Sequence, residues 1–189
     1  MPLEHAALAV LAYEPVSGYD LKKFFDQSVA HFWSVTQSHV YKVLNDLEKK
    51  GWATATLIPQ EGKPNRKEYD ITAAGRTELR RWLTTPLPPE AVRQAWLIQI
   101  FFAHDNSNAE ITALLDARID VMRRRLDIYR RDAQAAIDAS AAEVGIERMR
   151  QLWQLTLDYG IAYYQFELAW HQDALDRIRN LPPMPPSTP

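Results

Sequence analysis

Residues 36–51, TQSHVYKVLNDLEKKG, constrain the fold of this chain most, because their pattern predicts a helix with two unlike faces. At about 100° per residue, Val40, Leu44 and Leu47 fall on one narrow arc that is suited to packing on a core. The opposite arc is polar, with an aromatic ring, two cations and no acid: Ser38, Tyr41, Lys42, Asn45 and Lys49. Gly51 is the expected terminator of the helix. By itself this face is typical of a solvated surface, and its neighbours must show whether it instead enters a DNA groove.

Length and composition limit the class of protein. The 189 residues allow one large domain or two small ones, and 47% of them are hydrophobic, which is enough for a core. There is no apolar run of about 18 residues that would predict a membrane span. The first residues, MPLEHAALAVL, lack the basic leader of a signal peptide. Cysteine is absent, so disulfides, thiol catalysis and cysteine-based zinc sites are excluded, and we expect a cytoplasmic protein.

The first half of the chain predicts a recurrent DNA-binding arrangement. A helix over residues 3–13 precedes a second helix over about 18–30, capped by Ser17, after which Phe32 and Trp33 are expected to form an apolar plug. After Gly51, strands over 52–59 and 66–72 flank a Gly-Pro turn, and Thr72 caps a fourth helix. The order helix, helix, helix, hairpin, helix is that of a winged helix-turn-helix. In that fold the third helix faces the major groove and the hairpin reaches the backbone or minor groove.

The second half predicts a helical domain. Three prolines within residues 84–90 form a linker, and residues 91–104 are apolar on nearly every side, which predicts burial on more than one face. Ser107 and Glu110 fit a capping box at the start of a long helix, and Gly145 separates a last helix over about 146–180. That helix is apolar on two sides, so we expect a second copy of the chain to cover the surplus. The predicted domains are 1–85, 91–181 and a flexible Pro-rich tail, 182–189.

Three motifs give the first half a resemblance to a known family. They are Gly18-Tyr19-Asp20-Leu21, Tyr41-x-x-Leu44-x-x-Leu47-Glu48 and Tyr69-Asp-Ile-Thr72-Ala-Ala-Gly75-Arg76. In this order and spacing they resemble the PadR family of transcriptional regulators over about residues 3–84. Residues 91–180 resemble the C-terminal helical dimerisation domain of that family by length and pattern, without a sharp motif.

The resemblance implies a homodimeric repressor on a dyad-symmetric DNA operator. It also implies release from DNA by a small aromatic compound, of which phenolic acids are the best-known examples. Tyr41 matches the tyrosine of the family's third helix, and Lys63, Arg66 and Lys67 match its basic wing. Lys42 departs from the pattern, because many members have proline at this position.

The predicted DNA-binding residues lie on the third helix and the wing: Gln37, Ser38, Tyr41, Lys42, Asn45, Lys49, Lys63, Arg66 and Lys67. Gln37 and Asn45 are suited to an adenine edge, and Lys42 to guanine or a phosphate. Tyr41 is assigned to a phosphate, and His39 is expected to pack toward the core. The competing interpretation of the wing cations is that they only keep the hairpin tip soluble.

Aromatic residues of the second half are candidates for an effector pocket. The predicted set is Trp96, Tyr159, Tyr163 and His171, with Tyr164 and Trp170 as further candidates. Aromatic stripes at helical spacing usually pack, so a dimer core of the same residues is the competing interpretation.

Enzymatic function is not expected. The five histidines are scattered without the H-E-x-x-H spacing, and the chain contains no Gly-rich phosphate loop and no G-x-S-x-G. We therefore predict no catalytic residue, metal or cofactor. Two other classes stay open: a winged-helix module that binds protein, and a small-molecule-binding dimer with a secondary DNA role. A shared face for Lys42, Lys49, Lys63, Arg66 and Lys67 would favour DNA.

Overall fold

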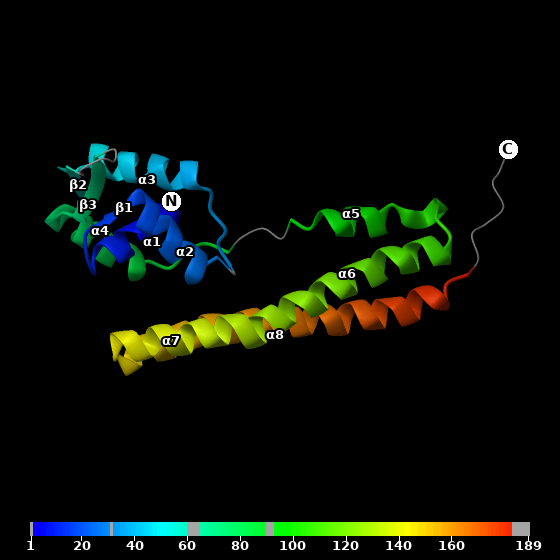
Figure 1. The fold of residues 1–189 in the computed structure, drawn as a ribbon. Helices are drawn as coiled ribbons and strands as arrows, with labels where there is room; N and C mark the ends of the chain where they lie inside the picture. The colour runs from blue at the N-terminus through cyan, green and yellow to red at the C-terminus, as the bar shows by residue number, and fades with distance from the viewer. Residues whose placement is uncertain (1, 31, 60–64, 90–92, 183–189) are drawn as a thin grey trace. The chain divides into compact units, whose positions relative to one another are not determined.

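The computed structural model describes residues 2–30, 32–59, 65–89 and 93–182. The chain is mainly helical and divides into two compact units, residues 1–89 and 90–189 (Figure 1). In chain order, the first unit comprises α1 (Pro2–Leu11), β1 (Val16–Ser17), α2 (Gly18–Gln27), α3 (Gln37–Lys49), β2 (Ala53–Ile58), β3 (Arg66–Ile71) and α4 (Ala73–Leu83). This is the predicted winged helix-turn-helix.

Hydroxyl side chains begin α2, α3 and α4, as the sequence predicts for two of them. Ser17 Oγ accepts from the Asp20 backbone N–H at 3.2 Å, and Thr72 Oγ1 accepts from that of Gly75 at 3.0 Å. Thr36 Oγ1 caps α3 at 3.4 Å. Each bond satisfies one of the backbone donors left open at a helix start. Beyond α3, Gly51 has φ +69°, a left-handed conformation that suits glycine, so α3 ends where expected.

The sheet has one strand more than predicted. β3 lies in the centre, between β1 and β2, and both pairings are antiparallel. β1 pairs Val16 with Tyr69, although the Pro15–Gly18 segment was expected to be a simple turn. Two residues are too few to show the alternation by which a strand is recognised. The predicted turn between β2 and β3, with Lys63, lies outside the described residues.

The apolar arc of α3 is the centre of the first unit's core. Val40, Leu44 and Leu47 are each 0% exposed, and they pack in one cluster with residues of α1, α2 and the sheet. Burying one such side chain contributes about 1.5–3 kcal/mol to stability. The rotation of α3 about its own axis is thereby fixed.

Three local expectations for this unit are wrong. α2 ends at Gln27 rather than near residue 30, and Phe32 and Trp33 do not form an apolar plug, since they are 54% and 39% exposed. Val35 is the residue of this connection that joins the core instead. His39 is exposed and not packed, because it lies just outside the arc that Val40 and Val43 bury.

The second unit comprises α5 (Ala95–Phe101), η1 (Ala103–Asp105), α6 (Asn108–Ile128), η2 (Tyr129–Ala133), α7 (Gln134–Val144) and α8 (Glu147–Arg179). α6, η2 and α7 run along α8 as a long hairpin, and α5 lies beside α6 (Figure 1). The predicted capping box is present at α6, with the Ser107 backbone N–H donating to Glu110 Oε2 at 2.8 Å. The π-helical turn η2 interrupts the helix that was predicted to be continuous. Of the predicted tail, residues 183–189 lie outside the described residues.

α8 carries two apolar stripes, and one of them packs against other helices of the second unit. Leu157 and Leu175 are buried against the other helices. The other stripe is exposed and contains Leu152, Leu155, Tyr159 and Phe166, which are 51%, 64%, 75% and 63% exposed. The prediction that α8 has more apolar surface than one chain can bury is therefore confirmed.

The segment over 91–104 differs from its prediction. α5 spans only seven residues, and of these only Trp96 is buried. Four large apolar residues that were expected to be buried are exposed: Leu97, Ile98, Phe101 and Phe102. Only the face of α5 that carries Trp96 packs against α6 and α8, so the remaining faces of this short helix stay exposed.

A carboxylate of α4 joins the first and last helices of the first unit. Glu78 accepts two hydrogen bonds from Arg81, from Nε and Nη2, each at 2.7 Å, and its Oε1 lies 2.9 Å from His5 Nε2. The Arg81 guanidinium, together with His5, lowers the pKa of Glu78 from 4.5 to about 2. Because the folded pKa is depressed, this stabilisation is present above about pH 4.5 and is lost as the pH falls toward 2.

We expect Glu78→Gln to lower the melting temperature by about 2 °C at pH 7. The difference from the wild type should shrink between about pH 5 and pH 2, because the wild-type carboxylate becomes protonated there. Thermal denaturation at a series of pH values measures this, with Glu14→Gln, an exposed glutamate, as the control. A difference that does not change with pH would contradict the assignment.

Candidate nucleic-acid interface

The exposed face of α3 has the composition that the sequence predicts. Ser38, Tyr41, Lys42, Asn45 and Lys49 are all exposed, whereas Val40, Val43, Leu44 and Leu47 are buried. Within the described part of the chain, Lys42 takes part in no ion pair, and the nearest acid to Lys49 is Asp46, at 3.9 Å. The face therefore presents hydrogen-bonding groups and two largely uncompensated cations.

Tyr41 is held at the edge of this face by a close approach to Gly18. A Cβ atom placed on Gly18 would lie 2.3 Å from Cε1 of Tyr41. Only a residue without a side chain leaves room for this ring, which remains 44% exposed. Gly18, from the first of the three sequence motifs, and Tyr41, from the second, therefore contact each other between α2 and α3.

Gln37 and Asn45 are oriented by neighbours rather than free in solution. Gln37 Nε2 donates to the Gly18 carbonyl at 3.3 Å, and Asn45 Oδ1 accepts from the Tyr69 hydroxyl at 3.2 Å. Among the residues that the structure describes, Gln37 Oε1 and Asn45 Nδ2 make no hydrogen bond, so each side chain keeps one polar atom for another partner. The two amides are therefore held in place before any ligand binds. A bidentate contact to a base uses both polar atoms of an amide, and one atom of each is already in a hydrogen bond.

The described wing cations are paired with acids of the same unit. Arg66 Nη2 lies 2.9 Å from both Asp20 and Glu68, and Lys67 Nζ donates to Glu48 at 2.8 Å. The bond to Glu48 raises the pKa of Lys67. These pairs connect β3 to α2 and α3. In this arrangement Arg66 and Lys67 hold the wing in place, and each retains partial exposure of its side chain, 40% and 39%.

A groove beside α3 contains residues that the sequence reasoning missed. It has a volume of about 640 Å³, lies between α2 and the segment that enters α3, and is lined by Tyr19, Lys22, Lys23, Asp26, Gln27, Val35, Thr36 and Gln37. Lys22 is paired with Asp26, whereas Lys23 has no ion pair among the described residues. In the sequence, the signal for this groove is the Lys22-Lys23 pair close to Tyr19 in α2.

The second unit brings three of the four predicted effector residues together. The Trp96 and His171 rings are 4.7 Å apart. Gln94 links Trp96 to Tyr163, since its Oε1 accepts from Trp96 Nε1 at 3.1 Å and its Nε2 donates to Tyr163 Oη at 3.2 Å. Burial, followed by the charge of Glu167, raises the pKa of Tyr163. Tyr159 stands apart on the exposed stripe of α8.

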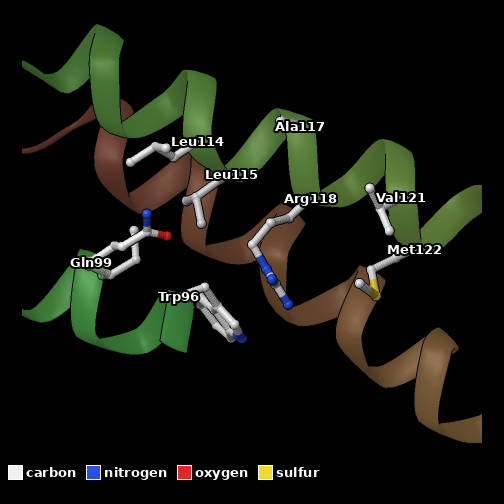
Figure 2. Close-up of a pocket in the computed structure, with 9 residues that line it drawn as sticks. Trp96, Gln99, Leu114, Leu115, Ala117, Arg118, Val121 and Met122 are labelled. Atoms are coloured by element: carbon white, nitrogen blue, oxygen red, sulfur yellow. The ribbon is translucent and has the colours of Figure 1, made fainter. Parts of the chain in front are cut away.

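A cavity of about 280 Å³ lies between α5 and α6 (Figure 2). Its walls are mostly apolar, and they are formed by Trp96, Gln99, Ile100, Leu114, Leu115, Ala117, Arg118, Val121 and Met122. Of the predicted effector residues, only Trp96 lines it. Arg118 was not predicted, because its helical spacing alone does not distinguish it from the solvated arginines of α6.

No helix among the described residues is long and apolar enough to cross a membrane. Within the same residues, no group of three or more histidine, aspartate or glutamate side chains is arranged to hold a metal ion.

A winged helix-turn-helix with an exposed polar third helix is typical of DNA-binding transcriptional regulators. Residues 7–81 match the Transcriptional regulator PadR-like family, and residues 92–179 match the family described as Virulence activator alpha C-term. The chain is 30% identical over 125 residues to the Negative transcriptional regulator PadR of Bacillus subtilis, covering 66% of this chain and 69% of that protein. The chain therefore belongs to the PadR-like family of transcriptional regulators.

A second relative is a probable transcriptional regulator of Mycobacterium tuberculosis, 42% identical over 89 residues. The match spans 47% of this chain and 47% of that protein, so it covers just under half of each.

Among solved structures, Bacillus subtilis PadR in complex with operator DNA has a TM-score of 0.78 and 24% identity, covering 94% of this chain and 99% of that one. The same protein in complex with p-coumaric acid has a TM-score of 0.74 and 23% identity, with the same coverage. These likenesses establish the fold.

We expect Gly18→Ala to destabilise the first unit by about 1–3 kcal/mol, because the methyl group overlaps the Tyr41 ring. In a Tyr41→Ala background the same substitution should cost almost nothing, since the overlap is gone. Urea denaturation of the four proteins of this double-mutant cycle measures the coupling. Equal costs of Gly18→Ala in both backgrounds would show that the contact does not restrict residue 18.

Proposed function

We propose that this regulator is a homodimeric repressor that binds a dyad-symmetric operator through α3 and leaves it when a small aromatic ligand, such as a phenolic acid, binds. The observation that carries the DNA-binding part is the exposed face of α3, with Lys42 and Lys49 largely uncompensated and Tyr41, Gln37 and Asn45 held in place. The name of the Bacillus relative, a negative regulator, supports repression. The operator and p-coumaric acid complexes of that protein support the two ligands.

The contacts are assigned by the position of each group. Lys42 and Lys49, with Lys63 of the wing, supply cations to phosphates or a guanine edge, whereas Ser38, Gln37 and Asn45 offer hydrogen bonds to bases. Arg66 and Lys67 support the wing through their ion pairs and offer their exposed parts to the backbone. The first unit spans about residues 1–85 in this proposal, and residues 91–181 supply the dimer and effector functions.

We expect Lys42→Ala to weaken binding to a DNA site that the wild-type protein selects from a random pool. The slope of log affinity against log salt should fall by about one, because one phosphate contact is lost. Titration of labelled DNA at several salt concentrations measures this, and Arg124→Ala, an exposed cation of α6, is the matched control. Unchanged affinity and slope in both Lys42→Ala and Lys63→Ala would contradict the interface.

The dimer is supported by the uncovered stripe of α8, to which the exposed residues of α5 add more apolar surface. Large exposed apolar surfaces are uncommon on monomeric proteins and usually mark interaction sites. A C2-symmetric pair presents α3 twice, as a palindromic operator requires.

We expect Phe166→Glu to convert the dimer to a monomer, because it places a charge within the uncovered stripe. Gln165→Glu adds the same charge on the polar side of α8 and should leave the dimer intact. Sedimentation velocity of both variants and the wild type gives the mass. A monomeric wild type, or a dimeric Phe166→Glu at micromolar concentration, would contradict the assignment of this surface.

One observation favours a second function, a winged-helix module that binds protein. The pairing of Arg66 and Lys67 with acids reduces the positive charge of the wing, and the whole chain has a net charge of −2. Selection of bound DNA from a random pool separates the two, since an interaction module enriches no sequence. The same selection repeated with p-coumaric acid tests release.

A further inference from the structure

The amide of Asn45 is bonded to a residue of the wing. Asn45 lies on the exposed face of α3, and its Oδ1 accepts from the Tyr69 hydroxyl at 3.2 Å. Tyr69 belongs to the central strand β3, where it pairs with Val16 on one side and with Ala55 on the other. It is 2% exposed. The strand pairing and the burial together fix the position of this hydroxyl beside α3.

The surroundings of the hydroxyl decide which way the Asn45 amide is turned. A buried hydroxyl proton needs an acceptor, and among the described residues the hydrogen-bond partner of Tyr69 Oη is Asn45. The charged group beside the ring is the Lys67 ammonium, whose Nζ lies 5.0 Å from the ring centre. An ammonium only donates, so it cannot accept the proton. The hydroxyl therefore donates to Asn45 Oδ1, and Nδ2 is the atom left for a partner.

Lys67 is held in this place by a second contact. Its Nζ donates to Glu48 of α3 at 2.8 Å. Glu48, which has the larger influence, and Tyr69 both raise the pKa of Lys67. The group therefore stays an ammonium at neutral pH and offers Tyr69 no acceptor.

The atom that Asn45 presents outward is thus a hydrogen-bond donor. Nδ2 makes no hydrogen bond within the described part of the chain. If the amide were turned over, Nδ2 would face the Tyr69 hydroxyl, and the buried proton would have no acceptor. An unsatisfied buried donor disfavours that orientation by about tenfold or more.

We propose that Asn45 selects a keto base, guanine or thymine, over an amino base, adenine or cytosine, and that Tyr69 is the positioning residue that sets this choice. In the major groove, guanine O6 and thymine O4 accept a hydrogen bond, whereas adenine and cytosine carry an amino donor at the corresponding place. An outward donor bonds to the first pair and opposes the second. This inference rests on the proposed function and replaces the adenine contact that was expected for Asn45 from the sequence.

The test starts from the DNA site that the full-length wild type selects from a random pool. Asn45→Ala identifies the base pair that Asn45 reads, because the preference should be lost there alone. Four labelled sites that differ only at this pair are then titrated. The sites with guanine or thymine on one strand should bind about tenfold more tightly than those with adenine or cytosine on that strand. One site bound more tightly than the other three would indicate a bidentate contact and overturn the proposal.

Asn45→Asp reverses the outward group. It keeps an acceptor for the Tyr69 hydroxyl and replaces the outward donor with an acceptor. The added negative charge lowers the affinity for all DNA, so the comparison is the ratio among the four sites. The two tightly bound sites should become the two weakly bound ones, a reversal that misfolding cannot produce. An unchanged order would show that the wild type already presents an acceptor, and would overturn the proposal.

Tyr69→Phe removes the hydroxyl and keeps the ring. The released amide can turn either way, so the ratio between the two groups of sites should fall from about tenfold to about twofold. A merely structural role of Tyr69 would lower the affinity for all four sites alike, and an unchanged ratio would overturn the positioning role. Tyr13→Phe, which changes an exposed tyrosine of the same unit, is the matched control and should keep the wild-type ratio.

The selection also separates this inference from the proposed function. A wild type that enriches no DNA sequence rejects both. A wild type that enriches a palindromic site, at which Asn45→Ala changes no preference, rejects the inference alone and leaves the DNA-binding function supported.

Discussion

The burial of one side of α3 is the constraint on which the DNA-binding unit depends. Val40, Leu44 and Leu47 lie in the common core with residues of the other helices and the sheet, so α3 cannot rotate without exposing them. Any 3.6-residue helix that commits one arc to a core commits the opposite arc to the surface. The identity of the outward residues, from Ser38 to Lys49, follows from this single packing arrangement.

Contacts at the edges of the exposed face of α3 hold several of its side chains in fixed positions. Tyr41 rests against Gly18, Gln37 donates to the Gly18 carbonyl, and Asn45 accepts from Tyr69. Side chains that are already held lose less rotational freedom when they meet a ligand, so more of their interaction energy appears as affinity. The ion pairs of Arg66 and Lys67 act similarly on the wing, although they also cancel part of its charge.

The helical unit uses its apolar residues in two different ways. One stripe of α8 forms the internal packing of the hairpin, and the other is exposed in the single chain. Between α5, α6 and α8, the Trp96, Arg118 and His171 side chains form a polar cluster at the wall of the cavity.

The sequence by itself determined the winged helix-turn-helix, the end of α3 just before Gly51, the caps Ser17 and Thr72, the capping box of α6 and the surplus of apolar surface on α8. Each of these depends on residues close together in the chain, whose spacing carries the signal. The tertiary structure alone decided the short strand β1, the pairing of Arg66 with Asp20 and of Lys67 with Glu48, and the meeting of Arg118 with His171. These contacts join residues 19 to 53 positions apart, and no local periodicity records which distant side chains the packing of a core brings together.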